Sequence, residues 1–272
     1  MLTSVEIKAI DAGGEKRRVE FGREGMTETV EAKFLLVNFG LNVLSQYLGQ
    51  SFQPDRTDEG SVFKINLLLR RLPRLKATRY PATEAFCGTF HIDEGYGEMN
   101  RSYEQAQAGQ LPDKLPSEMY CHTLTDDSIL SPELRAQGYH TLTLFGIDTP
   151  WALFADDNKV MSQRAERRFL DGINHWLAEP LEDCLAVARD GTRCLESKSP
   201  VDIEQSLGLF HGNIFQSAPS FPFASQEEQI GTWGVETDYP NVFLCGSSAQ
   251  RGGAVSGIPG HNAARKVLES IR

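Results

Sequence analysis

The sequence predicts an α/β fold combined with an α+β domain, and three observations indicate it. Alternating apolar and polar runs separated by glycine turns open the chain, and a short strand, a glycine-rich loop and a helix close it. The middle mixes strand-like and helical segments without regular alternation. With 272 residues, 40% of them apolar, the chain is expected to bury one large core or two modest ones.

The opening segment, residues 5–37, is typical of antiparallel hairpins. Runs such as Val5–Ile10 alternate in polarity, and glycine turns at Gly13–Gly14 and Gly22–Gly25 separate them. The next run, Phe34–Val37, is continuously apolar, which is typical of a strand covered on both faces. We therefore expect a three-stranded meander that leads into a buried parallel strand.

The middle of the chain contains strand-like runs and at least one long helix. Strands are expected at Val62–Leu69 and His140–Phe145. The apolar spacing within Asp156–Leu177 predicts an amphipathic helix that ends before Pro180. Ser199–Asp202 predicts a second helix start, because a hydroxyl, a proline and a carboxylate occupy the positions that cap a helix.

The end of the chain carries the most informative pattern. Asn241–Cys245 predicts a short buried strand, Arg251–Gly260 is a glycine-rich loop, and His261–Ile271 predicts a helix. Glycines let free backbone amides approach a ligand closely, and the helix dipole favours negative charge at its amino end. The pattern suits a phosphate or an electron-rich ring. The predicted helix is expected to bury Ala264, Val267, Leu268 and Ile271.

The same glycine loop is also compatible with a tight surface turn before a helix. It is not a phosphate-binding P-loop, because no Gly-Lys-Ser/Thr closes it. It also differs from the Gly-X-Gly-X-X-Gly fingerprint, which belongs near the start of a dinucleotide-binding domain. Spacing alone therefore leaves the two interpretations open.

Composition and charge exclude several classes of function. A formal charge of −10 and a pI near 5.1 disfavour nucleic acid and anionic lipid surfaces as partners. The longest mostly apolar stretch, Phe34–Leu44, contains Asn38, Gly40 and Asn42 and is shorter than a bilayer requires, so no membrane span is expected. The first residues have no apolar signal region, which predicts a cytoplasmic protein.

Neither the cysteines nor the histidines form a recognisable metal site or disulfide framework. The cysteines are odd in number and lack a Cys-X-X-Cys pair, which favours reduced, buried thiols. The histidines lack the spacing of a helical zinc site, so no metal is expected. The residues concerned are Cys87, Cys121, Cys184, Cys194, Cys245, His91, His122, His140, His175, His211 and His261.

The segment Tyr239–Ser270 resembles the C-terminal flavin-binding signature of the phytoene-desaturase-like, or phytoene dehydrogenase-related, FAD oxidoreductases. That signature is a strand ending in a glycine, a variable tetrad, and the pattern GGGVSG-x-PG-x-NAA. This chain follows it except that Ala254 replaces the third glycine. Weaker likeness extends to Phe63–Pro73 and Ser199–Phe215, and Gln216 stands where the family often has histidine.

The resemblance implies a fold and a chemistry. Residues 1–49 and 236–272 would form a partial FAD/NAD(P)-binding Rossmann-like domain, made of the meander and the last strands, with residues 50–235 as an inserted mixed-sheet substrate domain. The implied protein is an FAD-dependent oxidoreductase of the dehydrogenase, desaturase or saturase type, with the flavin as redox centre and an apolar small molecule as substrate. No catalytic side chain is implied. The implied cofactor-binding residues are Gly246, Ser247, Gly252, Gly253, Ala254, Val255, Ser256 and Gly257.

Members of that family are longer and begin with a strand and a Gly-X-Gly-X-X-Gly loop, which this chain lacks. We therefore expect it to be a C-terminal half that pairs with a missing N-terminal half, or that self-associates through an exposed sheet edge. A non-catalytic binding or assembly module is the alternative. A hydrolase or transferase that uses the glycine loop as an oxyanion site is disfavoured, because no Gly-X-Ser-X-Gly elbow accompanies the loop.

Overall fold

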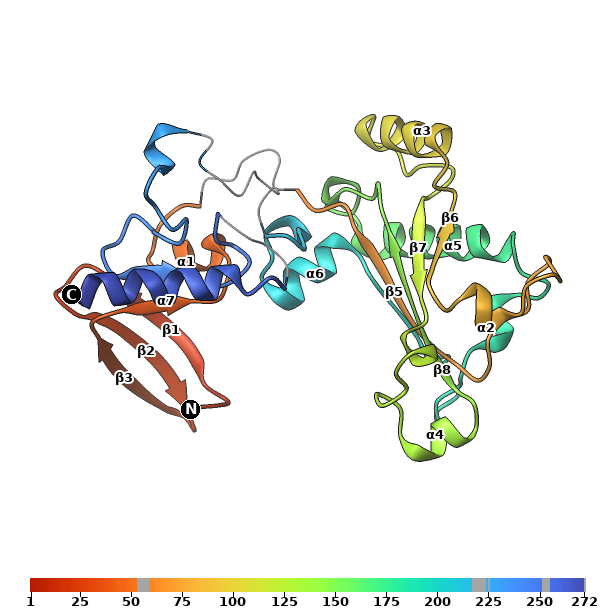
Figure 1. Ribbon diagram of the computed structural model, residues 1–272, viewed down its shortest axis with the longest axis horizontal. Coiled ribbons are helices and arrows are strands. Elements are labelled where there is room, and N and C mark those ends of the chain that lie inside the picture. Colours follow the sequence, from red (N-terminus) through yellow and green to blue (C-terminus); the bar gives the residue numbers. More distant parts are fainter. Residues whose placement is uncertain (53–58, 217–223, 225, 251–254, 272) are drawn as a thin grey trace. The chain divides into compact units, whose positions relative to one another are not determined.

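The computed structural model divides the chain into two compact units (Figure 1). Unit 1 contains Met1–Asp58 and Ser206–Arg272, and unit 2 contains Glu59–Gln205. The structure describes residues 1–52, 59–216, 224, 226–250 and 255–271.

The boundaries of the units differ from the expected ones at 49/50 and 235/236. The residues around 208 belong to unit 1 because the Asn42 side-chain amide donates to the Gly208 carbonyl at 2.9 Å. The residues before 236 belong there because the Leu244 amide donates to the Val235 carbonyl at 2.8 Å. What each unit binds stays a prediction.

Unit 1 begins with the expected meander. Strands β1 (Glu6–Asp11), β2 (Arg17–Arg23) and β3 (Met26–Ala32) form an antiparallel sheet in that order, which confirms the hairpin prediction. The next two strands, β4 (Leu35–Val37) and β10 (Val242–Leu244), pair in parallel although they lie at opposite ends of the sequence. The parallel strand predicted after the meander is therefore confirmed.

Among the described residues, β10 has a hydrogen-bonded neighbour on each edge, whereas β4 has one on a single edge. β10 lies between β4 and a bridge from Glu236, whereas β4 has β10 as its neighbour and no further strand in the described ranges. Leu36 is 45% exposed, so the expectation that this strand is covered on both faces is wrong for its central residue. In a parallel ladder alternate residues face opposite edges, so the Leu36 backbone faces away from β10.

Each parallel strand leads into a helix. α1 (Leu41–Tyr47) follows β4, and α7 (Ile258–Ile271) follows β10. The second helix starts three residues before the expected His261, because proline is tolerated in the first turn, where its missing N–H leaves no bond unmade.

The buried face of α7 differs from the predicted one. The helix buries Pro259, Asn262 and Ala263, and the Asn262 side chain donates to the Trp233 carbonyl at 2.9 Å. Among the residues expected to be buried, Val267 is half-buried, whereas Ala264, Leu268 and Ile271 are exposed. An apolar strip of α7 is therefore uncovered in the described structure.

Unit 2 is built on a five-stranded antiparallel sheet with the order β6-β7-β8-β5-β9. Burial alternates along its long strands, so one face packs into a core and the other is more exposed. The strands predicted at 62–69 and 140–145 are confirmed as β5 and β8. The strands are β5 (Phe63–Leu69), β6 (Thr89–Ile92), β7 (Ser117–Tyr120), β8 (His140–Gly146) and β9 (Leu195–Lys198).

Helix α5 (Asn158–Asn174) covers the buried face of this sheet, and Figure 1 shows it running behind the strands. Asp157 caps its start by accepting the Val160 amide at 3.1 Å. The Phe169 ring stacks on Phe63 of β5 at 5.5 Å between centroids. The helix ends well before Pro180, because the Asn174 side-chain oxygen accepts the Leu181 amide at 2.8 Å and turns the chain.

The remaining helices and 3₁₀ turns are distributed over both units. The predicted helix start at Ser199 is confirmed: the Asp202 amide donates to Ser199 Oγ at 3.1 Å, and the Ser199 amide donates to Asp202 Oδ2 at 2.9 Å. These helices are α2 (Ala82–Ala85), α3 (Tyr96–Gln107), α4 (Pro132–Ala136) and α6 (Pro200–Leu207), with single 3₁₀ turns at His122–Leu124, Trp151–Leu153, Leu181–Cys184, Phe210–Gly212 and Glu227–Gln229.

Glu179 ties the loop after β5 to the loop after α5. Its carboxylate accepts hydrogen bonds from the two terminal nitrogens of the Arg71 guanidinium, at 2.7 and 2.8 Å, and from the Arg74 backbone amide, at 3.0 Å. The Arg71 hydrogen bonds, followed by the Arg74 amide, lower the pKa of Glu179 to about 2. We expect Glu179→Gln to lower the free energy of unfolding by about 1–2 kcal/mol at pH 7, because charge-assisted bonds to a half-exposed arginine are lost.

The pH dependence has a definite sign. A carboxyl group with a depressed pKa stabilises the fold above its unfolded pKa, so this contribution should be lost as the pH falls from about 4.5 towards 2. Urea unfolding at several pH values measures it, with Asp127→Asn, which removes a more exposed carboxylate paired with Arg135, as the control. Equal effects of the two substitutions at pH 7 would contradict the assignment.

Candidate functional site

The candidate site of unit 1 lies where the parallel strands β4 and β10 end. Both strands point their carboxyl ends the same way, and each continues through a loop into a helix. The Cys245 amide donates to the Val37 carbonyl at 2.8 Å, so the two loops start side by side. In open α/β sheets, ligands bind outside the carboxyl ends of such strands.

The two loops approach each other closely at Gly246. A Cβ on this residue would lie 2.1 Å from Asn38 Oδ1 and 3.3 Å from Asn38 Cα, so a larger residue would displace the Asn38 side chain and press on its backbone. Two residues later, the Ser248 hydroxyl donates to the Phe39 carbonyl at 3.2 Å. These contacts hold the loop after β10 against the loop after β4.

A third segment, residues 208–216, joins the same place. It is held to α1 by the Asn42–Gly208 hydrogen bond, and the Gln216 side-chain amide donates to the Ser247 hydroxyl. His211 and Gln216 have φ angles of 46° and 64°, a left-handed conformation that is costly for residues other than glycine. Such backbone strain is found preferentially at binding and catalytic sites.

One polar atom at this junction has no partner among the described residues. The Gln216 Oε1 atom is buried and accepts no hydrogen bond, and it lies 3.6 Å from where a Cβ on Gly40 would be. Gly40 is the N-cap residue immediately before α1. A buried acceptor usually has a donor, which here could be supplied by an ordered water or by a bound molecule.

The start of α7 forms the outer part of the site. Gly246 and Ser247 contact the neighbouring loops as described, whereas Val255, Ser256 and Gly257 are exposed. A Cβ on Gly257 would meet no atom within 4 Å, so open space borders the amino end of α7. The predicted contacts Gly252, Gly253 and Ala254 lie outside the described residues.

The described part of this site offers no activated nucleophile. Burial raises the pKa of the Cys245 thiol, which keeps it protonated at neutral pH. The Phe210 ring stacks on the His211 ring at 3.9 Å, and both belong to the third segment. The arrangement is suited to binding through backbone and amide groups.

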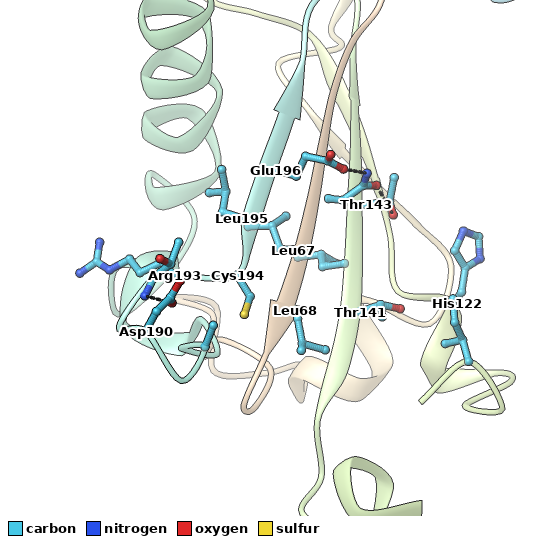
Figure 2. A pocket seen from close by; sticks show the side chains of 15 residues that line it. Leu67, Leu68, His122, Thr141, Thr143, Asp190, Arg193, Cys194, Leu195 and Glu196 are labelled. Atoms are coloured by element: carbon cyan, nitrogen blue, oxygen red, sulfur yellow. Dashed lines mark hydrogen bonds between the residues drawn. The ribbon is translucent and has the colours of Figure 1, made fainter. Parts of the chain in front are cut away.

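Unit 2 contains a second candidate site, a cavity of about 610 Å³ against strands β5, β8 and β9. Its lining is largely apolar, with Leu68 and Cys194 among the contributors, and Figure 2 shows these side chains and Thr141 in the same region. A polar strip crosses it, because Asn66 bonds to Glu196 and Thr143, each at 3.4 Å. In Figure 2, the Arg193 guanidinium points away from this region.

The sheet also gathers a group of metal-ligand types that the sequence did not reveal. His91, Glu94 and Glu118 place their ligand atoms within 4.8 Å of one another, because β6 pairs His91 opposite Glu118 of β7. His91 already bonds to Glu94, and Tyr120 donates to Glu118, which raises the pKa of the Tyr120 hydroxyl. These hydrogen bonds account for the cluster, and the cross-strand pairing explains why spacing along the chain could not predict it.

The described cysteines are all free, in agreement with the prediction of reduced thiols. The expectation that each is buried is wrong for Cys87, which is exposed, and only partly correct for Cys194 and Cys245, which are half-buried. Among the described residues, no helix has the length and apolar character needed to cross a bilayer.

Sequence comparison finds relatives longer than this chain, and no protein-family model matches it. The chain is 41% identical over 275 residues to uncharacterized proteins of Mycobacterium tuberculosis and Mycobacterium bovis, covering 100% of this chain and 51% of theirs. It is 28% identical over 226 residues to a Rattus norvegicus protein named pyridine nucleotide-disulfide oxidoreductase domain-containing protein 2, covering 79% of this chain and 36% of that protein. The chain thus spans about half the length, or less, of these curated relatives.

Comparison with solved structures finds flavin-dependent enzymes at low similarity. The flavin-dependent brominase Bmp2, as a triple mutant, aligns with a TM-score of 0.44 and 12% identity over 98% of this chain and 51% of its own. The flavin-dependent halogenase CmlS aligns with a TM-score of 0.40 and 13% identity over 98% and 34%. Alignments at these scores carry no conclusion about fold or function.

Proposed function

We propose that this chain is the C-terminal part of an FAD-dependent oxidoreductase of the dehydrogenase, desaturase or saturase type. The observation that carries the proposal is the convergence of the loops after β4 and β10 with the segment 208–216, which leaves a buried acceptor without a partner. The sequence likeness of residues 239–270 to a flavin-binding signature supports it. The name of the rat relative, which includes an oxidoreductase domain, also supports it.

The residues present fit a flavin in their chemistry. The flavin, when bound, would supply the electron transfer, and this chain would hold and orient it. Gly246 permits the close approach of the two loops, and Ser256 and Gly257 place exposed backbone at the amino end of α7. The positive end of that helix would stabilise negative charge on a reduced ring or a phosphate.

The proposed substrate is an apolar small molecule, and the cavity of unit 2 supports this class. Its apolar lining favours a hydrocarbon body, because burying apolar surface is the main driving force for such ligands. The strip formed by Asn66, Thr143 and Glu196 would bind a hydroxyl or carbonyl on the same molecule.

The proposed partner is a polypeptide that completes the sheet beyond β4. Two parallel strands of three residues are too small to be stable alone, and parallel sheets normally have both faces covered by helices. The Leu36 backbone faces the free edge, and Leu268 and Ile271 leave part of α7 uncovered. A strand and a helix carrying the ADP-binding glycine loop would pair with β4 and cover the exposed apolar side chains of α7.

The test is to express the chain with the genes that flank it naturally and to purify whatever assembles. We expect a yellow complex with the visible absorption bands of bound FAD, which are lost on anaerobic reduction and recovered with an electron acceptor. Size-exclusion chromatography of the chain alone should give self-association, since the β4 edge is then unpaired. A stable complex without flavin would contradict the enzyme proposal and favour the assembly module, and a monomeric chain that binds no partner would contradict both.

A further inference from the structure

We infer that Gln216 is a specific contact to the bound flavin, in which its Oε1 atom accepts a hydrogen bond from the cofactor. The inference rests on the proposed function and adds one residue with one role. Two parts of the flavin could donate this hydrogen bond: the N–H of the ring imide and the O–H groups of the ribityl chain. Three features of Gln216 itself support this contact.

The first feature is its place. Gln216 ends the third segment and lies between the other two, because its Nε2 donates to Ser247 after β10 and its Oε1 is beside Gly40 before α1. The only other side chain atoms of unit 1 that are buried without a partner in the described structure belong to Arg17, in the meander. The unpaired acceptor is therefore located at the carboxyl ends of the two parallel strands.

The second feature is that bracing alone does not explain a glutamine here. The brace to Ser247 uses only the NH₂ half of the amide, and a shorter polar side chain or a backbone group could supply it. Leaving the carbonyl half buried and unpaired destabilises the fold unless a donor is supplied. A ligand that brings the donor removes this cost.

The third feature is the backbone. Gln216 has a φ of 64°. Two backbone N–H groups hold this turn: that of Gln216 donates to the Asn213 carbonyl at 2.9 Å, and that of Phe215 donates to Asn213 Oδ1 at 2.9 Å. This turn holds Gln216 in one strained backbone conformation, and it thereby fixes the position of the side-chain amide before a ligand binds. A preorganised acceptor costs little entropy when the ligand binds.

The experiment compares two variants. Gln216→Leu removes the acceptor at similar size, whereas Gln216→Glu keeps an acceptor oxygen for the flavin and offers a second one to the Ser247 hydroxyl. FAD is titrated into each flavin-free complex, and the visible spectrum of the bound flavin and the thermal midpoint of the flavin-free complex are recorded. We expect Gln216→Leu to weaken FAD binding about two- to tenfold, the value of one hydrogen bond, with an unchanged thermal midpoint. Gln216→Glu should bind FAD nearly as wild type does and lower the flavin midpoint potential, because its charge opposes reduction.

The outcomes separate the alternatives. A shifted visible band in Gln216→Leu assigns the contact to the ring, and weaker binding with an unshifted band assigns it to the ribityl chain. Gln163→Leu, an exposed glutamine on α5, should change neither property. Wild-type FAD affinity in Gln216→Leu would overturn this inference but not the proposed function. The same would follow if both Gln216 variants bound FAD equally weakly and had equally lowered thermal midpoints. A wild-type complex that binds no FAD would overturn the proposed function as well.

Discussion

Gly246→Ala is expected to weaken FAD binding at least about tenfold and to destabilise unit 1 by about 1–3 kcal/mol. The added Cβ would lie 2.1 Å from Asn38 Oδ1 and 3.3 Å from Asn38 Cα. The Asn38 side chain can rotate away, but the backbone must also yield, and this separates the loops that the proposed site requires to be in contact. Flavin titration and urea unfolding of the same preparation measure both effects.

The matched control is Gly13→Ala in the turn between β1 and β2. A Cβ there would meet its nearest neighbour, Asp11 Oδ1, at 3.6 Å, which is an ordinary contact. We expect wild-type flavin binding and a stability within about 0.5 kcal/mol of wild type. Unchanged FAD affinity in Gly246→Ala would show that the junction of the two loops is not where the flavin binds.

Gly146→Ala is expected to cause the largest loss of stability in unit 2, about 3 kcal/mol, because the core is already filled at this point. A Cβ on Gly146, at the end of β8, would lie 1.9 Å from the Phe169 Cζ atom and 2.1 Å from its Cε1 atom. Phe169 is itself fully buried and stacks on Phe63 of β5, so its ring has little space into which it can move. Thermal or urea unfolding of the chain measures the effect.

Two further variants make this prediction specific. Gly88→Ala places a Cβ where no atom lies within 4 Å, and it should leave the stability nearly unchanged. Adding Phe169→Leu to Gly146→Ala should recover part of the loss, because the smaller side chain makes room for the new methyl group. Equal effects of the two glycine substitutions would contradict the packing described for α5.

Local pattern predicted the elements whose signals are local. The hairpins of residues 5–32, the strands β5 and β8, and the capped start at Ser199 follow from alternation, glycine turns and cap residues. The pairing of β4 with β10 required more, since a ladder between residues 35–37 and 242–244 is not encoded in either run. The sequence predicted a buried parallel strand at Phe34–Val37 and a short buried strand at Asn241–Cys245, but it did not predict that these two strands pair.

The errors have a common physical cause: burial depends on which neighbour covers a face. The spacing of Ala264, Leu268 and Ile271 correctly marks an apolar strip on α7, but the described part of the chain does not cover that strip. The same reason applies to Leu36, whose exposed side chain lies on a strand of buried type. Both residues are where a completing partner is proposed to pack.

The candidate site shows the same limit. The glycine pattern located the loop after β10, but it could not show that Gly246 packs closely against Asn38, about two hundred residues earlier in the chain. It also gave no reason to connect Gln216 with Ser247, because their contact depends on the left-handed turn at Gln216. The cavity of unit 2 and the His91 cluster arise from cross-strand pairing and left no signal along the sequence.

The most direct test of the central claim is amide hydrogen exchange of the purified complex with and without FAD. We predict that FAD slows exchange in the loop after β4, in residues 246–250 and in the segment around Gln216, which converge at the carboxyl ends of the two parallel strands. Protection confined to unit 2, or no protection in these loops despite bound FAD, would contradict it.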